Sequence, residues 1–198
     1  MPDLEVKIGE NNEILLRGKT ITTGYYKKPE ATAAAIDKDG WFHTGDAGYL
    51  KGNHLYLTER IKDLFKTSNG KYISPQALET KLSIDRYIDQ IAVIADQRKF
   101  VSALIVPVYG LVKNYAKEKG LEYKDMTDLL QHPKVQALFR ARIDTLQQQF
   151  AHYEQVKRFT LLSEPFSMER GELTNTLKLK RSVVAKNYKE LIDKMYEE

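Results

Sequence analysis

The stretch Ile91–Val108, "IAVIADQRKFVSALIVPV", contains two apolar runs on either side of a short polar segment. Within each run, Ile91–Ala95 and Val101–Val108, almost every residue is apolar, and this pattern is typical of strands that are buried. We therefore predict two buried strands here. Together with the long helix expected after them, these strands are predicted to provide the core of the fold.

Downstream of this stretch, the spacing of apolar residues predicts three helices and one further strand. Residues 111–120, "LVKNYAKEKG", predict a helix that ends at Gly120, because glycine readily ends a helix. Residues 158–163, "RFTLLS", predict a strand. Residues 132–155 predict a long amphipathic helix with the apolar positions Val135, Leu138, Phe139, Ile143, Leu146, Phe150 and Tyr153. The last helix, from Arg181 onward, is predicted to carry Val184, Tyr188, Leu191 and Met195 on one face.

Upstream, the first sixty residues predict a β-rich segment with one short helix from Pro29 to about Ile36, because proline is favoured at the first helical position. Residues 63–74, "DLFKTSNGKYIS", predict a hairpin, since the Asn69-Gly70 pair tolerates positive φ at both turn positions. A helix is expected to follow. Its predicted cap is Ser74, its first residue is Pro75, and its apolar face is Ala77, Leu78 and Leu82.

The order of these elements predicts an α+β fold in two parts. A β-rich segment comes first, and an α+β or α/β unit of about 135 residues follows, which is a normal size for a domain. Residues 4–9, "LEVKIG", already alternate like a strand. The chain is therefore expected to be a fragment of a longer protein, cut within a sheet.

The composition limits the classes of function. With 42% hydrophobic and 29% charged residues, the 198-residue chain resembles soluble globular proteins. It has no signal-peptide pattern and no apolar run near the roughly 20 residues that cross a bilayer, so a cytoplasmic protein is expected. The absence of cysteine excludes disulfides, zinc–thiolate sites and a thiol nucleophile. The net charge of +4 is compatible with an anionic ligand, but there is no dense basic tract for nucleic acid.

Four places carry polar residues that packing does not require. Asp46 ends the segment 40–46, "GWFHTGD", where a carboxylate can accept two hydrogen bonds from the vicinal diol of a ribose. Taken alone, a turn-capping aspartate is the simpler interpretation. Arg60 ends the predicted strand "LYLTER" and can reach a phosphate or ribose, although a solvated charge at a strand end is again simpler. In the predicted hairpin, Gly70 would let a ligand or another backbone come close.

The fourth place is Gly171–Arg181, "GELTNTLKLKR". A polar, threonine-rich loop here leads into three cations, Lys178, Lys180 and Arg181, at the start of the last predicted helix. Cations at the N-terminus of a helix oppose its dipole, so the start of a helix does not account for them. The cluster therefore indicates a negatively charged partner.

Taken together, these segments resemble the C-terminal part of the adenylate-forming enzymes, which include acyl-CoA synthetases, luciferases and the adenylation domains of peptide synthetases. Within that group they are most similar to long-chain fatty-acid–CoA ligases. The segments "EILLRG" (13–18) and "TGYYKKPEATAAAID" (23–37) resemble one characteristic stretch of these ligases, and "GWFHTGD" (40–46) resembles their ribose-binding stretch. The segment "ERIKDLFKTSNGKYISPQALE" (59–79) resembles their hinge region, and "GELTNTLKLKR" (171–181) resembles their catalytic-lysine loop. The matches occur in the family's order and cover essentially the whole chain.

The resemblance implies a role for each matching residue. Asp46 would bind the ribose hydroxyls of ATP, and Arg60 would assist at the ribose or phosphate. Lys62 would be the hinge on which a small domain turns. Lys178 would be the lysine of the adenylation step, with Lys180 left open as the alternative. The residues that would line the pantetheine tunnel for CoA are Ser68, Asn69, Gly70, Lys71 and Tyr72.

The sequence departs from the family pattern in two places. The segment from Asp46 to Arg60 is one residue shorter than is usual, and Asn175 replaces a common proline, which is expected to loosen the loop. The family's phosphate loop and the glutamate of its "YG-x-TE" segment are expected upstream. The implied division is residues 1–61, the β-rich end of a large AMP-binding domain, and residues 62–198, the hinge and a mobile C-terminal α/β domain.

The function implied by the resemblance is that of an ATP-dependent long-chain fatty acid–CoA ligase. ATP, CoA and Mg²⁺ would be bound mainly by the N-terminal part, and no metal site is expected in this chain, which alone is expected to be inactive. The alternatives are the adenylation domain of another carboxylate-activating enzyme and a non-catalytic nucleotide- or partner-binding module. Fatty acid, ATP and CoA are the expected partners, without nucleic acid. Contact of the full-length enzyme with the inner face of the membrane, and self-association through open strand edges, are left open.

Overall fold

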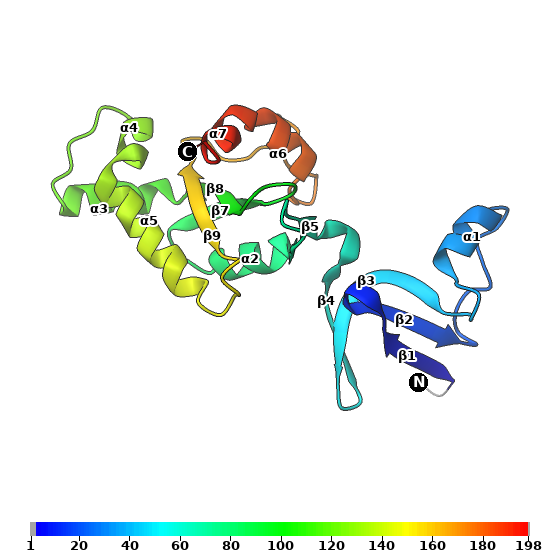
Figure 1. The fold of residues 1–198 in the computed structure, drawn as a ribbon. Coiled ribbons are helices and arrows are strands. Elements are labelled where there is room, and N and C mark those ends of the chain that lie inside the picture. Colours follow the sequence, from blue (N-terminus) through cyan, green and yellow to red (C-terminus); the bar gives the residue numbers. More distant parts are fainter. Residues whose placement is uncertain (1–2, 198) are drawn as a thin grey trace. The chain divides into compact units, whose positions relative to one another are not determined.

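The structure, a computed structural model (Figure 1), describes residues 3–197 apart from the side chains of Glu59 and Lys62. The chain falls into an N-terminal unit, Met1–Leu64, and a C-terminal unit, Phe65–Glu198, which are described separately. Strands and helices occur in both units, so the predicted α+β class is confirmed. The predicted domain boundary between residues 61 and 62 stays a prediction, because a division into two compact units does not test whether each unit folds on its own.

The N-terminal unit is built on an antiparallel four-stranded sheet with the order β1-β2-β3-β4. The helix α1, Pro29–Ala35, begins at proline as predicted. Two short 3₁₀ turns, Glu10–Asn12 and Ile61–Asp63, precede β2 and follow β4. The strands are β1 (Leu4–Ile8), β2 (Glu13–Gly18), β3 (Phe42–Lys51) and β4 (His54–Arg60).

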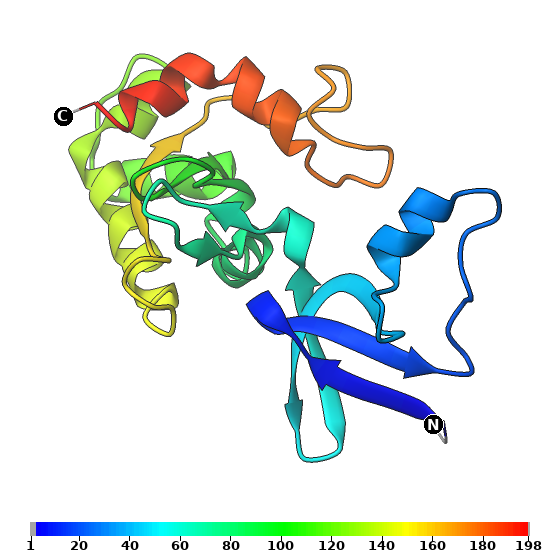
Figure 2. The ribbon, with the colours of Figure 1, turned by 45° about the vertical axis from the view of Figure 1, so that its right-hand side comes forward.

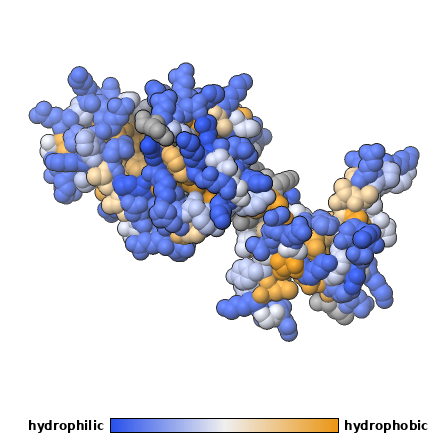
Figure 3. Space-filling view, viewed as in Figure 1, coloured by the Kyte–Doolittle hydropathy of each residue, from blue (hydrophilic) through white to orange (hydrophobic). Residues whose placement is uncertain are grey.

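The apolar core of the N-terminal unit is small. Its buried apolar residues within the described part of the chain are Ile14, Leu15, Trp41 and Ala47. Several large apolar side chains of the β3–β4 hairpin are exposed instead, and Figure 3 shows apolar residues at the surface of this unit. These exposed residues are Tyr49, Leu50, Leu55, Tyr56 and Leu57. Since burial of apolar surface is the main stabilising contribution, this unit gains less from it.

The C-terminal unit is built on a three-stranded sheet with the order β7-β8-β9. Its strands are β7 (Ile88–Ile94), β8 (Val101–Pro107) and β9 (Val156–Leu161). β7 is antiparallel to β8, whereas β9 is parallel to it. Every residue of β8 is buried, which confirms the prediction from the apolar run.

Helices cover both faces of this sheet (Figures 1 and 2). One face packs against α2 to α5 through a cluster that includes Leu78, Val112 and Phe139. The other face packs against α6 and α7 through a cluster that includes Val184 and Ile192. The helices are α2 (Pro75–Leu82), α3 (Tyr109–Glu118), α4 (Met126–Gln131), α5 (Pro133–Leu146), α6 (Arg181–Asn187) and α7 (Lys189–Lys194).

A two-stranded hairpin, β5 (Phe65–Lys66) and β6 (Tyr72–Ile73), precedes α2 as predicted. The turn uses positive φ only at Gly70, where φ is 75°, and not at Asn69. Gly70 N–H donates to Thr67 O, and Thr67 N–H donates to Lys71 O, which closes a three-residue turn with one left-handed residue. The predicted cap is confirmed, because the Ser74 hydroxyl accepts Ala77 N–H at 3.2 Å.

Two predicted helices are shorter than expected. α5 ends at Leu146 rather than continuing to Tyr153, because the Gln147 side chain accepts Val156 N–H at 2.8 Å and so ties the chain to β9. The last helix is divided at Tyr188, whose φ of −105° and ψ of 20° leave the helical region. Ala77 is exposed, so the predicted apolar face of α2 is wrong at that residue.

The helix α4 was not predicted from the sequence. α4 begins after Asp125, whose carboxylate accepts Asp128 N–H at 2.9 Å. Apolar spacing alone did not separate this short helix from the loop around it.

None of the helices in residues 3–197 combines the length and the apolar composition needed to cross a membrane.

The difference in buried core predicts an order of proteolysis. Limited digestion should cut first within residues 1–64, and a fragment that begins near residue 65 should persist, because two apolar clusters protect the C-terminal unit. Mass spectrometry of the fragments over time measures this order. First cuts confined to residues 65–197, with residues 1–64 left whole, would show that the order of stability is reversed.

Candidate functional site

Asp46 and Arg60 lie opposite each other on neighbouring strands of the N-terminal unit. They are register partners on β3 and β4, and Arg60 forms an ion pair with Asp46, with 3.0 Å between Nε and Oδ1. The Asp46 side chain is 24% exposed and that of Arg60 is 56% exposed, so a ligand can reach both. The sequence identified these residues one by one, whereas the hairpin makes them a pair.

The backbone around Asp46 is held by side chains. The Thr44 hydroxyl accepts Asp46 N–H at 3.1 Å and donates to Ile14 O at 2.7 Å. Gly45 has a φ of 70°, and its N–H donates to the Glu13 carboxylate at 3.0 Å. Thr44, and not Asp46, therefore caps this bend, and the Asp46 carboxylate is directed to Arg60. Glu13 has no local sequence signal for this role, because its partner lies 32 residues away along the chain.

Lys62 lies in the 3₁₀ turn Ile61–Asp63 that follows β4. Its side chain lies outside the described residues. The hinge assigned to Lys62 therefore stays a prediction.

The Ser68–Tyr72 turn lies in the C-terminal unit and is fixed by backbone hydrogen bonds. Ser68 N–H donates to Arg98 O at 3.0 Å, and Gln97 N–H donates to Lys66 O at 2.9 Å. All five residues of the turn are exposed. A Cβ added at Gly70 would meet no atom within 4 Å, so its positive φ, rather than a close contact within this unit, favours glycine here. The turn is rigid at its base and open at its tip.

The loop before α6 is also ordered by its own hydrogen bonds. Thr174 N–H donates to Lys178 O at 2.8 Å, and the Thr174 hydroxyl accepts Lys178 N–H at 3.1 Å. Leu173 and Leu179 form a β-bridge below them, and Leu177 takes a left-handed conformation with a φ of 59°. Asn175 is exposed and takes no part in these bonds, so the threonine supplies the order. Figure 2 shows this segment, in orange, projecting from the C-terminal unit.

The three cations of this segment differ in their surroundings. Lys178 and Lys180 are exposed, and within residues 3–197 neither ammonium takes part in a hydrogen bond or an ion pair. Arg181 instead binds both carboxylate oxygens of Glu79, at 2.5 and 2.6 Å. The prediction that all three cations await an external anion is therefore wrong for Arg181. Its negative partner is a residue of α2, which sequence spacing did not reveal.

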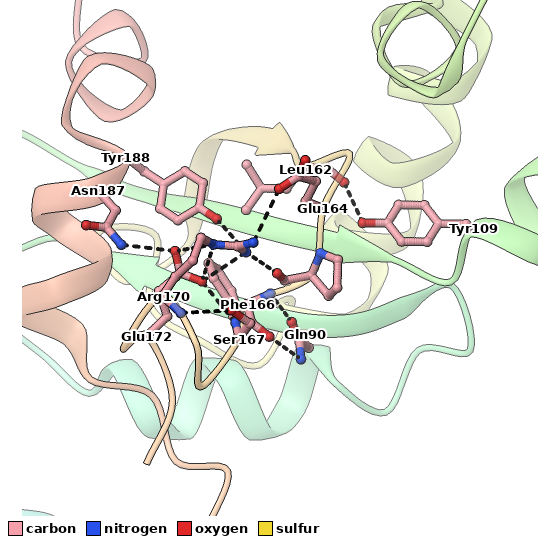
Figure 4. A network of polar contacts seen from close by, with 11 residues as sticks. Gln90, Tyr109, Leu162, Glu164, Phe166, Ser167, Arg170, Glu172, Asn187 and Tyr188 are labelled. Atoms are coloured by element: carbon pink, nitrogen blue, oxygen red, sulfur yellow. Dashed lines mark hydrogen bonds and ion pairs between the residues drawn. The ribbon is translucent and has the colours of Figure 1, made fainter. Parts of the chain in front are cut away.

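A buried carboxylate, Glu172, anchors the start of this loop (Figure 4). Its side chain is 1% exposed and forms an ion pair with Arg170 at 3.0 Å. Ser167 N–H donates to it at 2.9 Å, and the Asn187 amide donates at 3.1 Å. Burial alone would raise the pKa of Glu172, but hydrogen bonds from Arg170, Ser167 and Asn187 outweigh it and hold the pKa below the usual 4.5. The loop is thus tied to the end of α6 by a charged group that stays ionised.

The lowered pKa of Glu172 predicts a stability that depends on pH. The folded state binds this proton less readily than the unfolded state, so the stabilisation is present above about pH 4.5 and is lost as the pH falls through the folded pKa. At pH 7, Glu172→Gln should lower the free energy of unfolding by about 2 kcal/mol, because the charged hydrogen bonds are lost. Urea unfolding of both proteins at several pH values measures the difference.

The matched control for this variant is Glu169→Gln, because Glu169 is exposed in the same loop. The control should match the unaltered protein at every pH. If the difference for Glu172→Gln were the same at low pH as at pH 7, shape rather than charge would be responsible.

A family comparison identifies the C-terminal part of the chain. The model for the AMP-binding enzyme C-terminal domain matches residues 62–198. This chain belongs to that family. The match includes the Ser68–Tyr72 turn and the Lys178 loop.

Curated relatives of this AMP-binding enzyme C-terminal domain are similar over nearly the whole chain. The peroxisomal long chain acyl-CoA synthetase 7 of Arabidopsis thaliana is 37% identical over 192 residues, which are 94% of this chain and 27% of the relative. The long-chain-fatty-acid–CoA ligase FadD15 of Mycobacterium tuberculosis is 32% identical over 201 residues, which are 99% of this chain and 33% of the relative. The chain thus spans between about a quarter and a third of the length of these relatives.

Solved structures show the same fold. The adenylation domain of a carboxylate reductase from Mycobacterium chelonae is 25% identical with a TM-score of 0.73, over 98% of this chain and 31% of that chain. O-succinylbenzoate coenzyme A synthetase from Bacillus subtilis, in complex with AMP, is 22% identical with a TM-score of 0.56, over 92% of this chain and 33% of that chain. The likeness to the second structure is one of fold alone.

Proposed function

We propose that this chain is the C-terminal part of an ATP-dependent long-chain fatty acid–CoA ligase. The complete ligase, meaning this chain together with the further length that its relatives have, would form an acyl-adenylate and pyrophosphate and then transfer the acyl group to CoA. The similarity to curated long-chain acyl-CoA synthetases over at least 94% of the chain supports this proposal. Within that similarity, the segments that resemble the family's ribose, hinge and lysine stretches occur in the family's order.

The observation that carries the proposal is the exposed ammonium of Lys178 beside a neutralised Arg181. In the first half-reaction, a carboxylate attacks the α-phosphate of MgATP, and the two negative groups repel each other. A lysine held between them offsets this charge as it develops. The loop around Lys178 is ordered by Thr174 before any ligand arrives, so little reorganisation would be needed.

The other predicted site residues would act on the nucleotide and on CoA. Asp46 would accept hydrogen bonds from the ribose hydroxyls, and Arg60, now paired with it, would turn to the ribose or phosphate. For the second half-reaction, the C-terminal unit would turn about Lys62. The exposed Ser68–Tyr72 turn would then replace Lys178 and guide the CoA thiol to the acyl carbon.

Magnesium enters this proposal as part of the nucleotide substrate. Among the side chains that the structure describes, no three His, Asp or Glu groups gather in a way that could hold a metal ion. The ion would therefore be bound through the phosphates of ATP and by the remainder of the complete ligase.

Two further properties belong to the same proposal. The complete ligase, in the cytoplasm, would bind peripherally to the inner face of the membrane. Flotation of the complete ligase with anionic vesicles tests this binding. Copies of the chain would associate through the edge strands β1 and β4, and sedimentation velocity tests that association. A complete ligase that stays in the bottom fraction would contradict the membrane contact, and a chain that sediments as a monomer at every concentration would contradict the association.

A second candidate is the adenylation domain of another carboxylate-activating enzyme. The carboxylate reductase structures, at 25 and 26% identity with TM-scores of 0.73 and 0.69, favour this alternative. A non-catalytic binding module is the third candidate. Mass spectrometry of the products from the complete protein, given mixed fatty acids, ATP and CoA, separates them. Acyl-CoA supports the ligase, acyl-AMP without acyl-CoA supports the second candidate, and neither product supports the third.

The role of Lys178 predicts an effect on only one half-reaction. In the complete ligase, Lys178→Ala should slow acyl-AMP formation by roughly 10²–10³, the range for loss of one preorganised charge-stabilising group. The same variant should convert preformed acyl-AMP and CoA to thioester at the normal rate, because the loop has by then moved away. Rapid-quench kinetics of the separate half-reactions measure both rates.

The matched control for Lys178→Ala is Lys180→Ala, since both lysines are exposed on the same loop. The control should leave both half-reactions unchanged. A larger adenylation defect in Lys180→Ala would identify Lys180 as the catalytic residue. Equal loss in both half-reactions for Lys178→Ala would assign Lys178 to folding instead.

A further prediction concerns the 198-residue chain by itself. Purified alone, it should form no acyl-CoA above a blank, because the phosphate loop and the acyl pocket are expected in the further length that its relatives have. A coupled assay with radiolabelled fatty acid measures this. Product formation by the chain alone would contradict both the expected fragment and the division of the site.

A further inference from the structure

An ion pair joins α2 to the beginning of α6. The guanidinium of Arg181, the first residue of α6, binds Glu79 through two nitrogens, at 2.5 and 2.6 Å. The Glu79 side chain is 13% exposed and that of Arg181 is 30% exposed. Because a two-pronged pair fixes orientation as well as distance, it determines where α6 begins relative to α2.

Glu79 also binds the sheet. Val93 N–H, on β7, donates to Glu79 Oε1 at 2.8 Å. β7 is an edge strand of the three-stranded sheet, so this backbone group finds its partner in a side chain. One carboxylate thus holds α2, β7 and α6 together.

Apolar packing between α6 and β7 is incomplete beside this ion pair. A pocket of about 340 Å³ that is partly open to solvent lies there, and its lining includes Phe65, Val93, Leu179, Arg181 and Val184. A fully packed contact would leave no such space, so apolar contact is reduced on this side of α6 although Val184 is buried. The position of its first turn depends on the directional contact with Glu79.

The beginning of α6 is also the C-terminal end of the Lys178 loop, which is called its root below. Arg181 follows Lys180, whose N–H donates to Glu172 O at 2.8 Å, and the Leu173–Leu179 bridge lies next to it. The chain runs from this root directly to Lys178. A displacement of Arg181 therefore displaces Lys178.

The Ser68–Tyr72 turn is held by different bonds. Ser68 N–H donates to Arg98 O, Gln97 N–H donates to Lys66 O, and the Thr67 and Lys71 backbones bond to each other. None of these hydrogen bonds involves Glu79 or Arg181. Arg181 contacts the same hairpin through its guanidinium, which lies 5.6 Å from the centre of the Phe65 ring in β5, outside the hydrogen-bonded turn. A change at Glu79 should therefore move one of the two loops and not the other.

We propose that Glu79 is a positioning residue for Lys178. By holding Arg181, it fixes the root of the loop so that the ammonium of Lys178 is presented at the place where carboxylate and α-phosphate react. This inference rests on the proposed function. Adenylation depends on Glu79, whereas transfer of the acyl group to CoA does not.

The test uses Glu79→Gln in the complete ligase. Glutamine keeps the shape and one oxygen for Val93 N–H, but it loses the charge and the second acceptor for Arg181. The kcat of acyl-AMP formation should fall roughly 10-fold to 100-fold, as expected for a misplaced catalytic group. The KM for ATP should not change, because the proposed ribose contacts are made by Asp46 and Arg60. Thioester formation from preformed acyl-AMP and CoA should also not change.

A second variant, Arg181→Lys, keeps the charge but loses the fork, so it should show the same selective loss. Glu190→Gln, at an exposed glutamate of α7, is the matched control and should leave both rates unchanged. Equal loss in both half-reactions for Glu79→Gln would assign it a merely structural role and overturn the proposal. No loss in either half-reaction would overturn it as well.

Lys178→Ala measured in parallel separates this inference from the proposed function. If Lys178→Ala slows adenylation and Glu79→Gln does not, only the positioning role is overturned. If Lys178→Ala leaves adenylation unchanged, the proposed role of the lysine is overturned, and the positioning role with it.

Discussion

The burial of β8 on both faces is the constraint on which the C-terminal unit depends. A strand that is buried along its whole length must be covered from both sides, and helices α2 to α5 and α6 to α7 provide the two covers. The sheet has only three strands, so β7 is left as an edge. Glu79 satisfies one backbone group of that edge and at the same time binds α6. The requirement to cover one strand thus leads to the contact that positions the Lys178 loop.

Two buried or nearly buried carboxylates organise the charges around that loop. A carboxylate taken out of water needs a partner, and Glu172 is bound by Arg170 while Glu79 is bound by Arg181. An arginine suits this task because its planar fork matches two oxygens. The exposed ammonium of Lys178 has no such partner within residues 3–197. Among the cations of this segment, the arginines maintain the structure, and the two lysines face solvent.

Local patterns predicted the elements whose physical cause is local. The apolar runs predicted β7 and β8, proline predicted the start of α1, and Ser74 predicted the cap of α2. The prediction failed at the end of α5 and at the break between α6 and α7. At the first place a bond from Gln147 to β9 decides the end of the helix. At Tyr188, which packs on the cluster beneath α6 and α7, the apolar spacing continues although the helix does not.

The sequence by itself determined the type of most strands and helices, the order of the candidate site residues and the resemblance to adenylate-forming ligases, because periodicity, caps and short motifs involve neighbouring residues. Only the tertiary structure decided which charges meet. Asp46 faces Arg60 because β3 and β4 pair in one register. Arg181 meets Glu79 across 102 residues of sequence because two helices pack at the same strand edge. Such partners are brought together by chain packing over long sequence distances, and a local pattern contains no record of that packing.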